Sequence, residues 1–196
     1  MLVVIGLLSA LLLASQPAAV PREPYCPESC DENTVGPADI PTDAPRFSDY
    51  PAATYPTRHP AALHLLSHEA RMFRTVIREQ ASQGPNFAGH YTLIAIGCGA
   101  GATCWAIVDS NSGKVSFPDA IGETEDVNVD VAISPRSGEK IDFRLDSRLI
   151  VVPGERNEDK RTRGVSYLLW DGRQMRMLRF APHRPGPLQV HEPNFN

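Results

Sequence analysis

Two histidines stand four positions apart in the segment His64-Leu-Leu-Ser-His68, and Glu69 follows directly. On a helix, positions i and i+4 share one face, so the two imidazoles would be placed to bind one metal ion. The order H-x-x-x-H-E differs from the H-E-x-x-H of zinc proteases, in which the glutamate acts on the metal-bound water. A third ligand would have to come from His59 or His90. We prefer the alternative of a polar helix face and predict no metal and no cofactor.

His90 follows Gly89 and precedes an apolar run, so its imidazole would stand at the start of a strand. An imidazole there could act as a general base near Asp109, Asp146 or Ser147. A Ser-His-Asp hydrolase also needs its nucleophile on a constrained turn, and the chain contains no G-x-S-x-G sequence. The alternative is that His90 hydrogen-bonds the backbone and fixes the start of the strand.

A glycine-rich connection runs from Cys98 to Cys104 between two apolar, strand-like runs. It has no Lys-Ser/Thr and joins predicted strands, so it is not a phosphate loop of the P-loop kind. A disulfide across it would hold its backbone in one shape, and such pre-ordering lowers the entropy lost on binding. Trp105 beside it is either a core residue or a contact anchor. The candidate binding residues are His90, Gly99, Gly101 and Trp105.

The chain has four cysteines, which allow three pairings. Local pairing, Cys26 with Cys30 and Cys98 with Cys104, is favoured because the members of each pair are close in sequence. The alternative is a zinc site built from the same cysteines and nearby histidines. Structural zinc sites prefer about two to four residues between ligands, and the second pair has a wider spacing.

An export signal would explain the disulfides. Leu2–Ala14 is almost entirely apolar, which suits the hydrophobic region of a secretory signal and is too short to span a bilayer. Small residues at Ala18 and Ala19 predict a signal peptide over 1–19, with an uncleaved N-terminal anchor as the alternative. We therefore expect a periplasmic or secreted protein, in a compartment where disulfides persist, with no stable membrane span after signal removal.

Composition limits the remaining function classes. Hydrophobic residues make up 42% and charged residues 21% of the 196 residues, as in ordinary globular proteins. The net charge of -4 gives no footprint for nucleic-acid binding. We predict a Pro-rich irregular arm over 20–59, one globular domain over 60–180 and an irregular tail over 181–196. The scattered aromatic residues of the arm either dock it on the domain or form a contact surface: Tyr25, Phe47, Tyr50 and Tyr55.

One amphipathic helix is predicted over Pro60–Ser82, ahead of the strands. Pro60 suits a first helical position, and Gly84-Pro85 would end the helix. Apolar residues recur at helical spacing and predict a face that packs on a sheet. These residues are Leu66, Ala70, Phe73 and Ile77.

Short strand-like segments follow, and most of them are joined by local turns. Val127–Ile133 alternates apolar and polar residues, which is typical of a half-buried strand, and Glu123–Asp126 before it reads as an acidic loop. Asp171-Gly172 is a strong hairpin signal. The predicted fold class is α+β, with one N-terminal amphipathic helix packed on a mainly antiparallel β-meander that a disulfide stabilises. The meander would form either a twisted sheet or a small barrel. A propeller would need repeated blades.

Several short elements occur together in a fixed order: Asn86-Phe87-Ala88-Gly89-His90-Tyr91, Gly97-Cys98-Gly99, Cys104, Ala106-Ile107-Val108-Asp109, Gly113-Lys114-Val115 and Asp146-Ser147-Arg148-Leu149-Ile150. Over about Asn86–Phe180 this set resembles an uncharacterised family of secreted bacterial proteins. The chain departs from that pattern at Ile96, where the family usually has Trp, and in its wider cysteine spacing. The resemblance implies export and the disulfide, and it implies no particular chemistry.

The sequence therefore favours a binding protein over an enzyme. We expect a secreted or periplasmic protein that presents the Cys98–Cys104 loop to a protein or envelope partner, for example as an inhibitor or immunity-type factor. The alternatives are a hydrolase or metal-dependent enzyme that uses His90, or His64 and His68, and a structural component of the envelope.

Overall fold

The structure, a computed structural model, describes residues 33–54, 60–99, 101–125, 128–134 and 140–185. The predicted signal peptide over 1–19 and the Cys26–Cys30 pair lie outside the described residues. So do Tyr25, Tyr55 and His59, and the tail from 186 onward.

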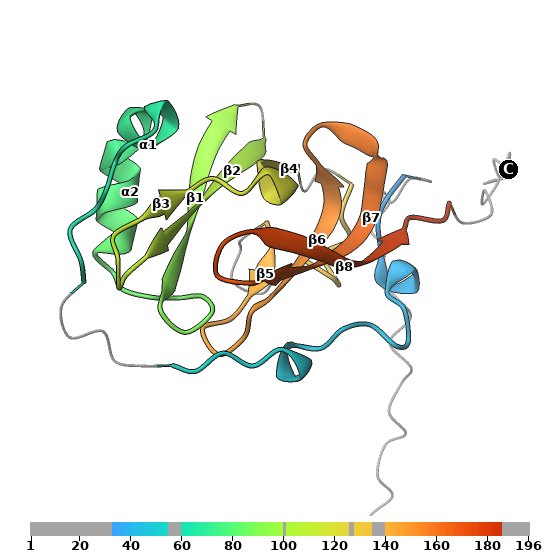
Figure 1. Cartoon of the computed structure of the whole chain (residues 1–196). Coiled ribbons are helices and arrows are strands. Elements are labelled where there is room, and N and C mark those ends of the chain that lie inside the picture. The colour runs from blue at the N-terminus through green and yellow to red at the C-terminus, as the bar shows by residue number, and fades with distance from the viewer. Residues whose placement is uncertain (1–32, 55–59, 100, 126–127, 135–139, 186–196) are drawn as a thin grey trace, which may run out of the picture.

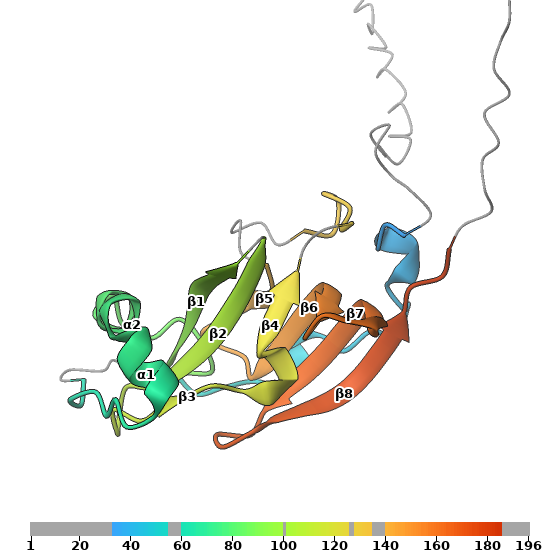
Figure 2. The same ribbon diagram turned by 90° about the horizontal axis from the view of Figure 1, so that it is seen from above.

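The described chain forms an eight-stranded antiparallel sheet in the order β1-β2-β4-β6-β7-β8, in which β3 pairs with β2 and β5 with β6. Neighbouring strands of this order follow one another along the chain, so the predicted meander is confirmed (Figures 1 and 2). The sheet is open, with β1 and β8 at its edges, and the small-barrel alternative is wrong. The strands are β1 (Tyr91–Gly99), β2 (Ala102–Asp109), β3 (Val115–Ser116), β4 (Glu123–Glu125), β5 (Asp142–Phe143), β6 (Leu149–Arg156), β7 (Asp159–Trp170) and β8 (Met175–Pro182).

The strand predicted over Val127–Ile133 is wrong in its described part, residues 128–133. The Asp130 side chain accepts a hydrogen bond from the Ala132 N–H at 2.8 Å, and the Asp130 carbonyl accepts from Ile133 and Ser134. Aspartate favours such a turn, and here the turn overrides the alternating pattern. The neighbouring acidic segment, which reads as a loop in the sequence, instead contains β4.

The predicted single helix over Pro60–Ser82 is wrong in extent. Its range holds two short helices, α1 (His68–Met72) and α2 (Arg74–Ala81), and the Ser67 hydroxyl caps α1 by accepting from the Ala70 N–H at 3.0 Å. Residues 60–67 are extended instead of helical. Within the described ranges, no helix has the length and apolar character needed to cross a membrane.

The segment before α1 is extended because its backbone binds the turn between β2 and β3. The Ala61 N–H donates to the Ser110 carbonyl at 2.9 Å, and the His64 N–H donates to the Gly113 carbonyl at 2.8 Å. Gly113 has φ +72°, and a Cβ on it would lie 1.9 Å from the Ala62 carbonyl oxygen. Only glycine allows this approach, so the turn and the segment fit together at one position. Leu66, predicted on the buried helix face, is 79% exposed.

Side chains of alternating strand positions fill both faces of the sheet. On one face of β1 and β2, Leu93, Trp105 and Ile107 join a core cluster that also contains Leu168 and Trp170 of β7. On the opposite face, Ile77 of α2 packs on residues of β1 and β2, which are Ile94, Ile96, Ala106 and Val108. The helix thus covers one end of that face, as Figure 2 shows.

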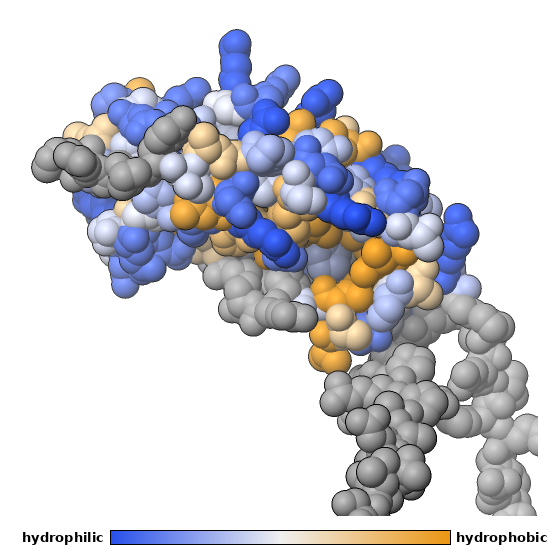
Figure 3. All heavy atoms as spheres, turned by 90° about the horizontal axis from the view of Figure 1, so that it is seen from below, coloured by the Kyte–Doolittle hydropathy of each residue, from blue (hydrophilic) through white to orange (hydrophobic). Residues whose placement is uncertain are grey.

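The described part of the arm, residues 33–54, covers the other end. Val35 is fully buried against Leu149, Val165 and Tyr167, and Phe47 and Tyr50 pack on the same cluster. In Figure 1 the arm runs along the lower side of the sheet, with the short 3-10 helices Pro37–Asp39 and Phe47–Asp49 on its way. Seen from below, this side carries hydrophobic residues between hydrophilic ones (Figure 3). Phe47 and Tyr50 therefore dock the arm.

Candidate functional site

The β1–β2 hairpin ends in a disulfide-bonded tip. Ile96 pairs with Cys104 and Gly97 with Thr103, and the register then shifts before Gly99 pairs with Ala102. The predicted disulfide between Cys98 and Cys104 is present, with the two Cα atoms 5.8 Å apart. Gly99 and Gly101 have φ values of +143° and +88°, which L side chains rarely adopt. The tip therefore needs its glycines as well as its disulfide.

Backbone atoms form most of the surface of this tip. Gly97, Cys98, Gly99 and Gly101 are all exposed, and a Cβ built on any of the three glycines would meet nothing within 4 Å. Two predicted binding residues, Gly99 and Gly101, thus lie together on an open surface. We name residues 97–99 and 101 the hairpin tip.

Two side chains bond the free backbone edge of β1 as far as Ala95, just before the hairpin tip. The Gln80 side-chain amide donates to the Ala95 carbonyl at 3.0 Å, and the Asn86 amide bonds both backbone groups of Leu93. These side chains occupy the free edge of β1, where another strand would otherwise pair. Outward-facing backbone groups recur every second residue, so Gly97 continues the same edge, and it is exposed.

Three glutamates lie next to the hairpin tip. Glu123 and Glu125 of β4 pair with Cys104 and Ala102 of β2, and Glu158 comes from the β6–β7 turn. One carboxylate oxygen of each lies within 4.8 Å of the others. Burial, with the charges of Glu158 and Glu125, raises the pKa of the Glu123 carboxyl. Sequence reasoning missed this cluster because Glu158 reaches it only through the fold.

The glutamate cluster offers oxygen ligands to a cation, but it is a sparse set. Calcium takes about six to eight oxygen ligands, and the three carboxylates supply three if each binds through one oxygen. Glu158 is exposed, and Glu123 and Glu125 are half-buried. The absence of a metal stays a prediction from the sequence.

Trp105, the fourth predicted binding residue, lies in the core. It is 1% exposed, and its indole Nε1 donates to the Thr124 hydroxyl at 2.8 Å. Thr124 is the residue of β4 whose side chain faces inward between the two glutamates. Trp105 therefore anchors β4 to β2 and presents no surface to a partner.

His90 lies at the opposite end of β1 from the hairpin tip. Its Nε2 is 3.5 Å from Asp109 Oδ1, and its ring stacks on Tyr91 with 4.2 Å between centroids. The Asp109 carboxylate also accepts from the Asn111 N–H at 2.9 Å and the Ser112 hydroxyl at 2.7 Å. Of the three neighbours that the sequence allowed for His90, namely Asp109, Asp146 and Ser147, Asp109 forms this pair, and it also organises the β2–β3 turn.

Ser147, the candidate nucleophile, has a structural role in this fold. It is 1% exposed, and its hydroxyl lies 2.8 Å from the Phe47 carbonyl and 3.0 Å from the Tyr50 carbonyl. It also accepts from the Leu149 N–H at 3.2 Å. A hydroxyl held in this way fixes the arm to β6 and is poorly placed to attack a substrate.

His64 and His68 do not share a helix face. His64 lies in the extended segment before α1, where it forms an isolated bridge with Lys114, and His68 is the first residue of α1. Both side chains are exposed. The i, i+4 arrangement on which the metal hypothesis depends is therefore wrong.

A pocket of about 290 Å³ adjoins His90. Four segments line it: the arm, the start of β1, the residue before β6, and the turn after β7. Sequence reasoning missed this set because its members are scattered along the chain. We name it the His90 pocket; its principal residues are Pro51, Ala52, His90, Tyr91, Arg148 and Trp170.

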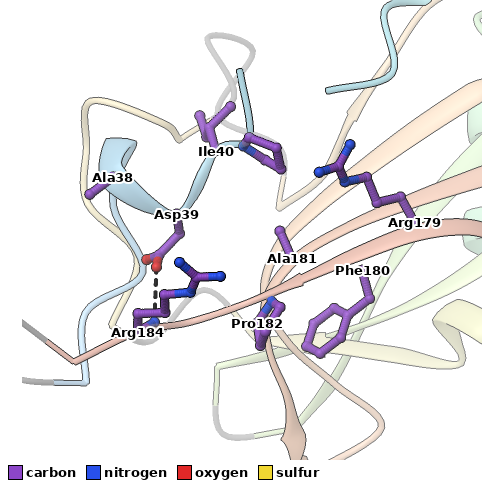
Figure 4. Close-up of a pocket in the computed structure, with 9 residues that line it drawn as sticks. Ala38, Asp39, Ile40, Arg179, Phe180, Ala181, Pro182 and Arg184 are labelled. Carbon is purple, nitrogen blue, oxygen red and sulfur yellow. Dashed lines mark hydrogen bonds between the residues drawn. The ribbon is translucent and has the colours of Figure 1, made fainter. Parts of the chain in front are cut away.

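A second pocket, of about 240 Å³, lies where the arm meets the end of β8. Asp39 Oδ2 is 2.8 Å from His183 Nδ1, and the carboxylate accepts from the backbone N–H groups of Gly36 and Arg184, each at 3.0 Å. Figure 4 shows the Asp39 carboxylate turned toward the Arg184 backbone. Burial raises the pKa of Asp39, but the hydrogen bonds from His183, Gly36 and Arg184 outweigh it and hold the pKa below its usual value. These contacts tie the two ends of the described chain together.

Comparison of the chain with protein-family models, with curated proteins and with solved structures finds no match in any of the three. The resemblance over Asn86–Phe180 to a secreted bacterial family stays a prediction from the sequence.

Proposed function

We propose that the protein is an exported binding protein that presents the hairpin tip to a partner protein in the periplasm or outside the cell. The observation that carries the proposal is the exposed backbone of residues 97–99 and 101, which the Cys98–Cys104 disulfide holds in one conformation. A fixed surface loses little conformational entropy on binding. The disulfide would persist in an oxidising compartment, which fits the predicted export.

The partner would contact the tip through main-chain hydrogen bonds. Gly97 continues the free edge of β1 beyond the positions that Asn86 and Gln80 occupy. An extended peptide can add to such an edge, where main-chain bonds supply affinity and side-chain pockets supply specificity. Because the glycines carry no side chains, they leave room for a close approach.

The glutamate cluster indicates which charge the partner surface should carry. Glu123, Glu125 and Glu158 place three carboxylates beside the tip, and burial together with the charges of the other two raises the pKa of Glu123. A lysine or arginine of the partner would relieve that repulsion, and complementary charge accelerates association. The proposed partner surface is therefore basic.

A capture experiment tests the proposal. The oxidised protein would carry a photo-reactive residue at Ala102, which follows the hairpin tip and leaves its glycines intact, and be irradiated in an envelope extract. The same residue at Arg173, in the exposed β7–β8 turn, serves as the control. We expect a cross-linked protein from position 102 alone, and its yield should fall in the Cys98→Ser/Cys104→Ser and Glu158→Gln backgrounds. Equal cross-linking from both positions, or none from position 102, would count against the hairpin tip.

The hydrolase alternative has less support from the geometry. His90 and Asp109 form a pair, but the Ser147 hydroxyl is engaged with the arm. The metal-dependent alternative loses its helical ligand pair, because His64 precedes α1. Metal analysis of the purified oxidised protein distinguishes the classes: stoichiometric zinc that is lost in His68→Ala would favour an enzyme.

A further inference from the structure

The His90 pocket combines an apolar wall with unused hydrogen-bond donors. Pro51, Ala52 and Ala53 of the arm form part of its lining, and Ala88 adds to it from the start of β1. Its volume of about 290 Å³ is close to the lower end of the usual range for small-molecule sites. The pocket is distinct from the hairpin tip, which lies at the other end of β1.

The first unused donor is the indole of Trp170. The residue is 3% exposed, and its Nε1 has no hydrogen-bond acceptor in the described part of the chain. The Tyr91 ring stands edge-on to it, with centroids 5.4 Å apart, and the Tyr91 hydroxyl lies nearby without the geometry of a hydrogen bond. Buried polar groups normally have partners. The other tryptophan, Trp105, has one in Thr124.

The second unused donor is the guanidinium of Arg148. It makes no ion pair or side-chain hydrogen bond with any described residue, in contrast to Arg163, which pairs with Glu155, and Arg179, which pairs with Asp43. Asp171 is the acidic residue of the lining, and its carboxylate accepts the Arg173 and Gln174 N–H groups of its own turn at 2.9 and 2.8 Å. The Arg148 guanidinium therefore remains available to a ligand in the pocket.

The two carboxylates near the pocket already have hydrogen-bond donors. Asp109 lies 3.5 Å from His90 and accepts from Asn111 and Ser112, and Asp171 accepts from the N–H groups of its own turn. The Arg148 guanidinium and the Trp170 N–H are left without a partner among the described residues, beside an apolar wall. Arginine binds carboxylates through two parallel hydrogen bonds, which is a geometry that few other groups match.

We propose that the His90 pocket binds a small organic carboxylate, with the Arg148 guanidinium and the Trp170 indole N–H as donors to its oxygens. The apolar part of the ligand lies against the alanine and proline wall of the arm. This site takes a free small acid, whereas the hairpin tip takes a protein.

Indole resonances in an NMR titration test the proposal directly. The chain has two tryptophans, so a nitrogen-15 spectrum shows two indole N–H signals, which Trp170→Phe assigns. Benzoate and hexanoate are the probes, and benzamide is the neutral match for benzoate. We expect millimolar benzoate or hexanoate to move the Trp170 signal and to leave the hydrogen-bonded Trp105 signal in place. Benzamide should bind at least about tenfold more weakly than benzoate, since a charged hydrogen bond is lost.

Two arginine variants complete the test. Arg148→Gln should weaken benzoate binding at least about tenfold. Arg144→Gln, on the same connection but stacked over Phe47 at 4.2 Å, should bind benzoate as the wild type does. An unchanged Trp105 signal shows that each variant is folded. The proposal is overturned if neither acid moves the Trp170 signal, if benzamide binds as well as benzoate, or if Arg148→Gln retains full affinity.

Discussion

The side-chain amide of Asn86 bonds both backbone groups of Leu93: it donates to the Leu93 carbonyl at 3.0 Å and accepts from the Leu93 N–H at 2.7 Å. One side chain thus does what a neighbouring strand would do at this position of the β1 edge. Unpaired edges are sites of edge-to-edge association, so this contact protects the fold as well as stabilising it.

Asn86→Ala should therefore destabilise the protein and expose the edge. Removing the amide leaves two backbone groups of Leu93 without a partner, and we expect a loss of about 1–3 kcal/mol in the free energy of unfolding. Urea denaturation measures the loss, and light scattering at rising concentration measures self-association. Gln83→Ala, at an exposed position nearby, is the control and should change neither.

Cys98→Ser should lower the melting temperature in oxidising buffer. The disulfide closes a short loop, with a sequence separation of 6, and the chain-entropy account gives it about 2 kcal/mol. Calorimetry of the wild type with and without reductant provides the comparison, and the variant should reproduce most of the effect of reduction. A melting curve that matches the oxidised wild type would show that the disulfide contributes little stability.

The buried Asp39 carboxylate should make stability depend on acidity. Its pKa is lowered in the fold from an unfolded value near 3.8, so its contribution is present above that value and is lost as the pH falls through the lower, folded pKa. We expect Asp39→Asn to be less stable than the wild type at neutral pH. The difference should shrink as the pH falls below 3.8 and through the lower, folded pKa. Urea unfolding of both proteins across this range checks the sign; a constant difference would contradict it.

Ser147→Ala should loosen the arm. The hydroxyl bonds the Phe47 and Tyr50 carbonyls, so its loss should speed hydrogen exchange and proteolysis around residues 47–52. Ser48→Ala, at an exposed position on the arm, is the matched control. Loss of an esterase or amidase activity in Ser147→Ala, with an intact arm, would instead restore the catalytic interpretation.

Local signals predicted the meander well. Asp171-Gly172 joins β7 to β8, and the two cysteines bracket the β1–β2 turn. These features depend on residues that are close in sequence, where turn chemistry decides the outcome. Of the two roles that the sequence left open for the arm's aromatic residues, Phe47 and Tyr50 have the docking role.

The failures have a non-local and a local cause. The segment before α1 has a helical pattern but binds the distant Gly113 turn, and the alternation over Val127–Ile133 yields to the local turn at Asp130. The His90 pocket needs Arg148 and Trp170, which no local signal connects to His90. Hydrophobic periodicity describes a single helix or strand. It therefore cannot show which distant segments lie close together in the fold.

Val35, near the beginning of the described chain, is buried with Ala181 near its end, and Leu149 and Val165 complete the same cluster. During synthesis the chain emerges with its N-terminus first, so Val35 appears long before β8. The arm therefore cannot pack until the last strands have formed. Residues from near both ends of the described chain complete this cluster, so a fragment truncated at either end would leave the cluster incomplete.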